Sequence, residues 1–228
     1  MLYNTSFNKS NLDYYLKELA YEFRKLNRGG YPIEMIIVGG AAILANYGFR
    51  DSTTDIDCYA PIESSLKMAI QRVGERFGLD PHWVNSDFKN TASYSPKVVE
   101  FSRHYRDFNH TFSVRVITGA YLIAMKLVAA RTYKYDQSDI LGILIEHQRQ
   151  LEPINLEMIQ KAVLDLYEKL DVVKPEMWKF IEDLLKIEDL EETYLFSRTL
   201  EISNAEIQEF IHLDQTDNTK ELLQMLEI

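Results

Sequence analysis

The sequence predicts an α+β fold, with a small mixed β-sheet and flanking helices in residues 1–118 and a helical domain in residues 119–228. Two observations support this fold class. Before residue 118, short apolar strand patterns alternate with helical patterns. After Thr118-Gly119 the apolar spacing becomes helical and stays helical, and no Gly- or Ser-rich linker separates the two parts. We therefore expect the helical domain to pack directly against the α/β domain.

The α/β domain is predicted to begin with an N-terminal helix. Residues 9–28 carry apolar side chains at helical spacing, and Gly29-Gly30 ends this run as a C-cap would. Pro61 closes the second strand before the next helix. The elements expected in this part are a helix at 9–28, a strand at 34–38, a helix at 41–47, a strand at 55–59 and a helix at 62–77.

Further strand patterns complete the predicted sheet. His82-Trp83-Val84 is a candidate strand, and the Asn-, Ser-, Asp- and Pro-rich residues 85–96 form a loop. Strands are expected at 97–102 and 111–117. Residues 103–110 are polar and have the length of a hairpin connection.

The helical domain is predicted from apolar periodicity and from two prolines. Pro153 precedes the third helix of this part, and Pro175 lies near the start of the fourth. The expected helices cover 120–132, 137–150, 155–170 and a region from about 175 that continues through Phe196.

Composition and charge limit the class of protein. The chain has 228 residues, 46% of them hydrophobic, which is enough for a substantial core. It has no run of about 18 apolar residues and no N-terminal targeting pattern, so we expect a cytoplasmic protein without membrane contact. Cys58, the single cysteine, excludes an internal disulfide and is expected to pack in the core.

The net charge of −10 is distributed unevenly along the chain. Residues 1–150 hold 18 Lys and Arg against 16 Asp and Glu, whereas residues 151–228 hold 7 against 19. An acidic chain is poorly suited to sequence-independent nucleic-acid binding. The densest basic and aromatic group is either a local nucleic-acid contact or an ordinary solvated hairpin, and it contains Arg103, His104, Tyr105, Arg106 and Arg115.

Residues 35–59 contain the most informative pattern, an apolar strand, Gly39-Gly40, a short helix, and then Asp55-Ile56-Asp57 on a second strand. Side chains at i and i+2 of a strand share a face, so both aspartates point the same way. Paired carboxylates suit Mg²⁺, which fills its shell with water and phosphate oxygens. Glycines at a helix start let phosphate approach the free N–H groups. Each motif alone is often only a turn or a solvated strand end, but their order predicts a nucleotide and metal site.

The stretch Gly39-Gly40 followed by residues 50–57 resembles the nucleotidyltransferase fold superfamily, the DNA polymerase β-like proteins. Within it, the sequence is most similar to the bacterial nucleotidyltransferase-like group that includes the AbiEii-type toxins. A second stretch, residues 121–139, resembles the later helical motif of that group, a lysine and an arginine followed by two aspartates. These four residues are Lys126, Arg131, Asp136 and Asp139.

The resemblance implies a metal-dependent enzyme that uses a nucleoside triphosphate, with Mg²⁺ or Mn²⁺ as the cofactor. The predicted catalytic residues are Asp55, Asp57, Lys126 and Asp139. The predicted nucleotide-binding residues are Gly39, Gly40, Arg50, Thr53, Thr54, Arg131 and Asp136. For the helical motif a second interpretation stays open, in which Lys126, Asp136 and Asp139 only lock two helices together.

One departure from the superfamily pattern concerns the third carboxylate, which these enzymes usually place on a later central strand. Here the strand at 112–116 carries Arg115 and no acid. Glu100, on the strand expected at 97–102, is the nearest substitute and is predicted as a third metal ligand from strand alternation.

The sequence therefore predicts transfer of a nucleoside monophosphate from a nucleoside triphosphate to an acceptor hydroxyl. The acceptor is a tRNA end, a protein or a small molecule. Three versions stay open: a toxin paired with an antitoxin, an antibiotic-type adenylyltransferase, and a nucleotide-binding protein of the same fold without turnover.

Overall fold

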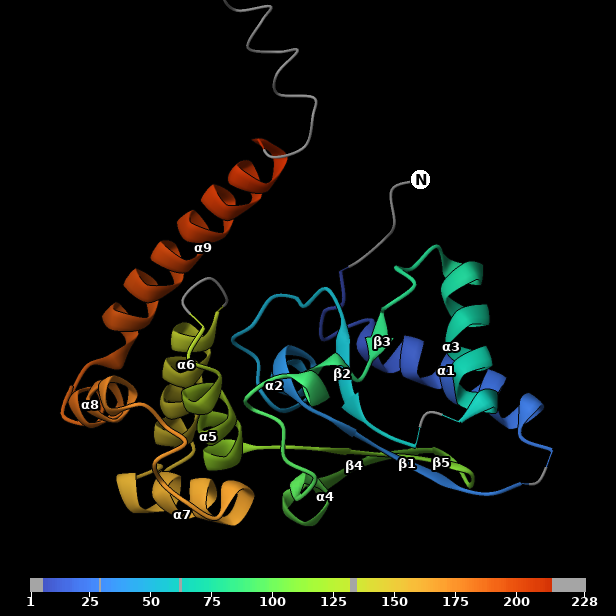
Figure 1. The fold of residues 1–228 in the computed structure, drawn as a ribbon, viewed down its shortest axis with the longest axis horizontal. Coiled ribbons are helices and arrows are strands. Elements are labelled where there is room, and N and C mark those ends of the chain that lie inside the picture. The colour runs from blue at the N-terminus through green and yellow to red at the C-terminus, as the bar shows by residue number, and fades with distance from the viewer. Residues whose placement is uncertain (1–5, 29, 62, 132–134, 215–228) are drawn as a thin grey trace, which may run out of the picture.

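The computed structural model describes residues 6–28, 30–61, 63–131 and 135–214, with side chains up to residue 203. Figure 1 shows the sheet on one side of the molecule and the C-terminal helices on the other. The predicted α+β class, a small mixed sheet with flanking helices, is confirmed. Within these ranges, none of the helices combines the length and apolar character that crossing a bilayer requires.

In the part of the chain that the structure describes, the sheet has five strands in the order β3-β2-β1-β5-β4. They are β1 (Ile33–Ile37), β2 (Ile56–Tyr59), β3 (Val84–Asn85), β4 (Arg103–Asn109) and β5 (Phe112–Val116). β1 is parallel to β5 and antiparallel to β2, and β2 is parallel to β3. The end of β1 therefore lies beside the start of β2, where the two predicted motifs meet.

Two helices before β3, α1 (Leu12–Leu26) and α3 (Ser64–Phe77), pack against each other beside the sheet (Figure 1). The apolar stripe of α1 is buried as its spacing predicts. Glu22 of α1 is also buried, and it pairs with Arg72 at 3.1 Å and with Arg76 at 3.0 Å, both on α3. Burial alone would raise the pKa of Glu22, but Arg72, Arg76 and Lys25 outweigh burial and lower that pKa.

The C-terminal part is helical throughout its described length. Its helices are α5 (Gly119–Ala129), α6 (Asp136–Arg149), α7 (Leu156–Tyr167), α8 (Pro175–Leu184) and α9 (Leu190–Asp214). α5 packs against both α6 and α7, and α6 packs against α9. Most of α5 is buried because it lies between these helices and the sheet domain.

The segment that follows α2 (Gly39–Asn46) contacts the C-terminal helices through two aromatic residues, Tyr47 and Phe49. The hydroxyl of Tyr47 accepts a hydrogen bond from the Gly119 amide at 2.9 Å and lies 3.1 Å from Nε2 of His147. The Phe49 ring lies directly over Gly142 of α6. The backbone carbonyl of Phe49 accepts a hydrogen bond from the hydroxyl of Tyr194 at 3.2 Å. The two parts are thus in direct contact, while a domain boundary at residues 118 and 119 stays a prediction.

The prediction of a strand at residues 97–102 is wrong. Residues Val98–Phe101 form the short helix α4, and the predicted hairpin connection is strand β4. Pro96 fixes a backbone angle suited to a helical turn, and Ser95 accepts from the Lys97 amide at 3.2 Å. β4 is polar because it is the edge strand of the sheet, where charged side chains are well tolerated.

The Phe49 contact makes a prediction for Gly142. A Cβ at this position would lie 2.4 Å from the Phe49 ring, so Gly142→Ala should destabilise the protein by about 1–3 kcal/mol through overpacking, despite alanine's better helix propensity. In a Phe49→Ala background the same change should be stabilising, by up to about 1 kcal/mol. Chemical denaturation of the four variants of this cycle measures both effects, and additive effects of the two substitutions would contradict the contact.

Candidate active site

A cavity of about 210 Å³ lies between the sheet and α5. The predicted site residues that line it are Gly39, Asp55, Asp57, Lys126 and Arg131. Val38 also lines the cavity. The segment after β3 contributes Asp87, Phe88, Thr91 and Ser93, and α5 contributes Leu122, Met125 and Ala129. Residues distant in the sequence are thus brought to one place, as the order of the motifs predicts.

Asp55 and Asp57 flank Ile56 at the start of β2. Ile56 and Cys58 are fully buried on the core side of the strand, so the two aspartates share the other face. The side-chain amide of Asn85 donates to Oδ2 of Asp55 over 3.3 Å. This hydrogen bond holds one carboxylate of the pair from the neighbouring strand β3.

The aspartate pair fits a hard divalent cation that takes few protein ligands. Among the described residues, no three or more His, Cys, Asp or Glu side chains are arranged to hold a metal ion. The two carboxylates that share one strand face at this cavity are Asp55 and Asp57, and Asp87 also lines it. Mg²⁺ commonly binds one or two carboxylates and completes its shell with water and substrate phosphate, so this donor set suits an ion that arrives with a nucleotide.

Gly39 is required by the backbone at the start of α2. Its φ is +63°, a left-handed value that disfavours other residues, and a Cβ there would lie 3.3 Å from Oδ2 of Asp57. Val38 precedes it and cannot cap the helix through its side chain, so the first amides of α2 can bind an anion.

Gly40 makes room for protein side chains. A Cβ at Gly40 would lie 2.6 Å from the hydroxyl oxygen of Thr53 and 3.0 Å from Nη2 of Arg50. Thr53 is buried, and its backbone pairs with Phe7, the amide of each donating to the carbonyl of the other at 2.8 Å. Thr54 is exposed and does not line the cavity. The structure thus places Arg50 and Thr53 against the Gly-Gly turn.

Five charged side chains form one alternating series, which we call the charge chain. Arg50 pairs with Asp139, and Oδ2 of Asp139 lies 2.7 Å from Nζ of Lys126. The same Nζ donates to Oδ1 of Asp136 at 2.8 Å, and Nε of Arg131 donates to Oδ2 of Asp136 at 3.0 Å. The order is cation, anion, cation, anion, cation, and it links the sheet domain to α5 and α6.

Burial and pairing act in opposite directions on the charge chain. Burial alone would lower the pKa of Lys126, but the carboxylates of Asp139 and Asp136 raise it above its ordinary value. Burial alone would raise the pKa of Asp136, but Lys126 and Arg131 outweigh burial and hold that pKa at about 2. Lys126 and Asp136 are therefore both charged at neutral pH.

Helix α9 holds the first turn of α6, which carries Asp136 and Asp139. The carboxylate of Glu201 accepts from the amides of Gln137 at 2.9 Å and Ser138 at 3.2 Å, so it caps α6. Burial raises the pKa of Glu201, and its second oxygen has no hydrogen-bond partner among the described residues. Sequence reasoning missed this residue because nothing local links positions 137 and 201.

The Tyr135 ring, at the start of α6, contacts two guanidinium groups. The carbon atom of the Arg198 guanidinium lies 3.9 Å from the ring centre, and that of Arg50 lies 5.4 Å from it. Arg50 therefore contacts Asp139 and Tyr135 together, and Arg198 joins α9 to the same turn.

Glu100 lies outside the cavity. The prediction that it is a metal ligand relied on a strand, but Glu100 lies on helix α4 and is exposed. Asp87, in the 3₁₀ helix η1 (Asp87–Asn90), lines the cavity instead. No local sequence signal marks Asp87, because its place depends on the pairing of β3 with β2.

The predicted basic and aromatic group does not line the cavity. Arg103 and Arg106 lie on β4, and Arg106 pairs with Asp13 of α1 at 2.7 Å. The hydroxyl of Tyr105 donates to the same aspartate at 2.7 Å, and Arg115 donates to Ser102. These contacts favour the interpretation as an ordinary surface hairpin.

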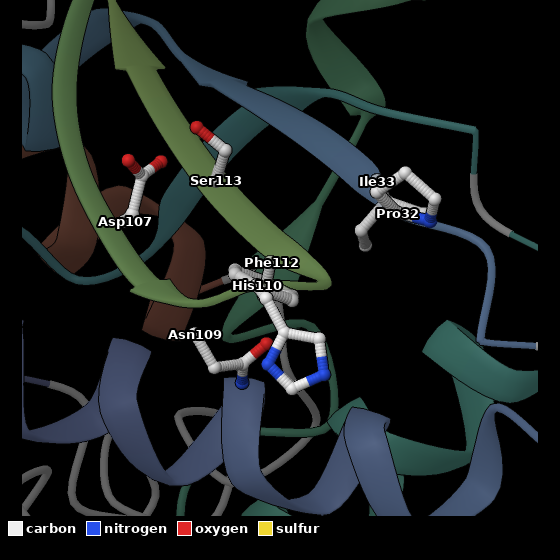
Figure 2. Close-up of a pocket in the computed structure, with 7 residues that line it drawn as sticks. All are labelled: Pro32, Ile33, Asp107, Asn109, His110, Phe112 and Ser113. Atoms are coloured by element: carbon white, nitrogen blue, oxygen red, sulfur yellow. The ribbon is translucent and has the colours of Figure 1, made fainter.

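A second pocket, of about 290 Å³, lies at the opposite end of the sheet, where β1 and β5 begin. Figure 2 shows Pro32 and Ile33 on one side of it and the β4–β5 turn on the other, with Asp107, His110 and Ser113. It contains no lysine or arginine among its lining residues, so it lacks the cations that a triphosphate requires.

A mixed sheet that places a glycine helix start beside a strand with paired aspartates is compatible with the nucleotidyltransferase fold. The chain belongs to the family described as nucleotidyltransferase of unknown function (DUF6036), whose model matches residues 14–195. Comparisons with curated proteins and with solved structures gave no match. The resemblance to the nucleotidyltransferase superfamily is thereby confirmed, whereas closeness to AbiEii-type toxins stays a prediction.

The charge chain predicts a large effect for Lys126→Met. This substitution leaves two buried carboxylates without their shared cation and should lower the free energy of unfolding by about 3–5 kcal/mol. Lys161→Met, which removes the exposed pair with Asp165, should lower it by about 0.5 kcal/mol or less. Chemical denaturation of both variants makes the comparison, and equal losses would contradict the role of Lys126.

The pKa of Asp136 predicts a loss of stability in acid. Because its pKa is about 2 in the folded protein against an ordinary 3.8, its stabilisation is complete above about pH 4 and is lost as the pH falls towards 2. This contribution is about 2 kcal/mol. The free energy of unfolding should fall more steeply between pH 5 and 2 in the wild type than in Asp136→Asn, whereas the exposed control Asp171→Asn should follow the wild type.

Proposed function

We propose that the protein is a Mg²⁺- or Mn²⁺-dependent enzyme that transfers a nucleoside monophosphate from a nucleoside triphosphate to an acceptor hydroxyl. The observation that carries this proposal is the cavity that Asp55 and Asp57 share with the amide end of α2. The aspartates would hold the ion, and the free amides at Gly39 would bind phosphate. The bound ion would supply Lewis-acid stabilisation to the phosphoryl group.

The cations of the charge chain have different roles in this proposal. Lys126 has three N–H donors, and two carboxylate oxygens already lie within 2.8 Å of its Nζ, so at most one donor reaches a phosphate. Its main role would be to position Asp136 and Asp139. The Arg131 side chain is 31% exposed and lines the cavity, which suits it to balance charge on the leaving pyrophosphate.

The cavity volume bears on the acceptor. About 210 Å³ is below the roughly 300–1,000 Å³ of pockets that enclose a drug-sized ligand. The site can therefore hold the reacting phosphates, while most of the acceptor lies outside it. This favours a large acceptor, such as a tRNA end or a protein, over an enclosed small molecule.

The proposal predicts that Asp57→Asn abolishes transfer. The protein is incubated with each nucleoside triphosphate labelled in the α-phosphate, with Mg²⁺, and with total RNA, the protein alone or a panel of hydroxyl-bearing antibiotics. We expect label on one acceptor class, and a loss of about 100-fold or more in Asp57→Asn because the ion loses a ligand. The matched control is Asp51→Asn, an exposed neighbour that does not line the cavity.

The outcomes separate the versions of the proposal. Label on RNA or protein supports the large acceptor, and label on an antibiotic supports the adenylyltransferase. Nucleotide binding without transfer would show a protein that does not turn over its nucleotide. Growth arrest of bacteria by the wild type, and none by Asp57→Asn, would support the toxin role and justify a search for an antitoxin. Full activity in Asp57→Asn would exclude the metal assignment.

A further inference from the structure

We propose that Asp87 is the third catalytic carboxylate, and that it takes the proton of the acceptor hydroxyl, which enters the cavity over η1. This inference rests on the proposed function and adds the path of the acceptor to it. The sequence assigned the role of the third carboxylate to Glu100, which lies on α4. We assign it instead to Asp87, which lies on η1.

The position of Asp87 is fixed relative to the aspartate pair by one buried side chain. Asn85 pairs in register with Asp57 across β2 and β3. Its Nδ2 donates to Oδ2 of Asp55 at 3.3 Å, and its Oδ1 accepts from the Asp87 amide at 2.8 Å. Asn85 is only 7% exposed. A single amide thus joins the Asp55 carboxylate to the turn that carries Asp87.

The order of the strands determines on which side of the aspartate pair Asp87 lies. β2 lies between β1 and β3, so the aspartates have the start of α2 on one side and η1 on the other. In-line transfer requires the attacking oxygen and the leaving pyrophosphate on opposite sides of the α-phosphorus. With the leaving phosphates at the amides of α2, the hydroxyl must arrive from the side of η1.

The wall beside Asp87 differs from the phosphate side of the cavity. Phe88, Leu122 and Met125 contribute apolar surface there, and Thr91 and Ser93 contribute hydroxyl groups that lie 2.9 Å apart. Hydroxyl and apolar groups suit an uncharged alcohol and its carbon neighbours better than they suit a phosphate. This wall therefore favours an acceptor end that presents a hydroxyl.

In this proposal Asp87 serves as a base and not as a third ligand of the ion. The three aspartates line one cavity, yet among the described residues no three acidic side chains are grouped closely enough to hold a metal ion. Asp87 is also exposed, so it is available to a group that enters from outside. A carboxylate in this position can act as a general base.

One bond forms and one bond breaks at the α-phosphorus in this step. The acceptor oxygen forms a bond to the α-phosphorus, its proton passes to the Asp87 carboxylate, and the bond between the α-phosphorus and the bridging oxygen of the β-phosphate breaks. Pyrophosphate leaves with that electron pair. The proton on Asp87 then passes to water, which restores the carboxylate.

The test compares Asp87→Asn with Asp57→Asn in two measurements. The first is binding of Mn²⁺ and each nucleoside triphosphate, followed by electron paramagnetic resonance, and the second is transfer of α-phosphate label to total RNA or to the protein. We expect Asp87→Asn to retain Mn²⁺-nucleotide binding and to lose transfer by about 100- to 10,000-fold. Asp57→Asn should lose both. Asp87→Glu should recover part of the transfer, because it restores the base.

Asp80→Asn is the matched control, since Asp80 caps the turn before β3 and does not line the cavity. Loss of Mn²⁺ binding in Asp87→Asn would overturn the inference by making Asp87 a metal ligand, and wild-type transfer in that variant would overturn it directly. In both cases the proposed function survives as long as Asp57→Asn is inactive. Failure of the wild type to bind any nucleotide would instead overturn the proposed function and this inference with it.

Discussion

The ion pairs of Lys126 with Asp136 and Asp139 are the interaction on which the rest of the site depends. Both carboxylates are almost fully buried, and such groups remain charged only beside a cation. Arg50 and Arg131 extend the series at its two ends, so the sheet domain, α5 and α6 are held in one arrangement. The same contacts that stabilise the junction between the sheet and the helices therefore place the cavity wall opposite the aspartate pair. The contacts show the structural role of this motif, while a catalytic role for its residues stays a prediction.

The sequence predicted the parts of the site that depend on local pattern. Asp55 and Asp57 share a face because a strand has a period of two, and no distant residue is needed to establish this. The prediction for Glu100 was wrong because secondary-structure propensity could not distinguish a short helix after Pro96 from a strand. The strand that follows, β4, is polar and therefore did not show the apolar pattern of a strand. Asp87 was missed because its place depends on parallel pairing between β2 and β3, and Glu201 because its partners lie over 60 residues away.

The two glycines of the Gly-Gly turn have separate physical roles. Gly39 has a left-handed backbone and lies against Asp57, so it belongs to the cavity side of the turn. Gly40 faces the other way, where its missing side chain accommodates Thr53 and Arg50. Because Arg50 also pairs with Asp139, the second glycine connects the amino-terminal end of α2 to the charge chain. The Gly39-Gly40 motif, which predicts phosphate binding from the sequence, is thus also needed for packing at Gly40.

Helix α9 contacts the first turn of α6 through Arg198 and Glu201 and then continues to Asp214, away from the other elements in Figure 1. The length beyond Glu201 is about 20 Å at 1.5 Å per residue. Glu201 lies near the middle of α9, so the cap that it forms on α6 depends on helical backbone on both sides of it. Shortening α9 would therefore reach the site indirectly, by loosening the turn of α6 that carries Asp136 and Asp139.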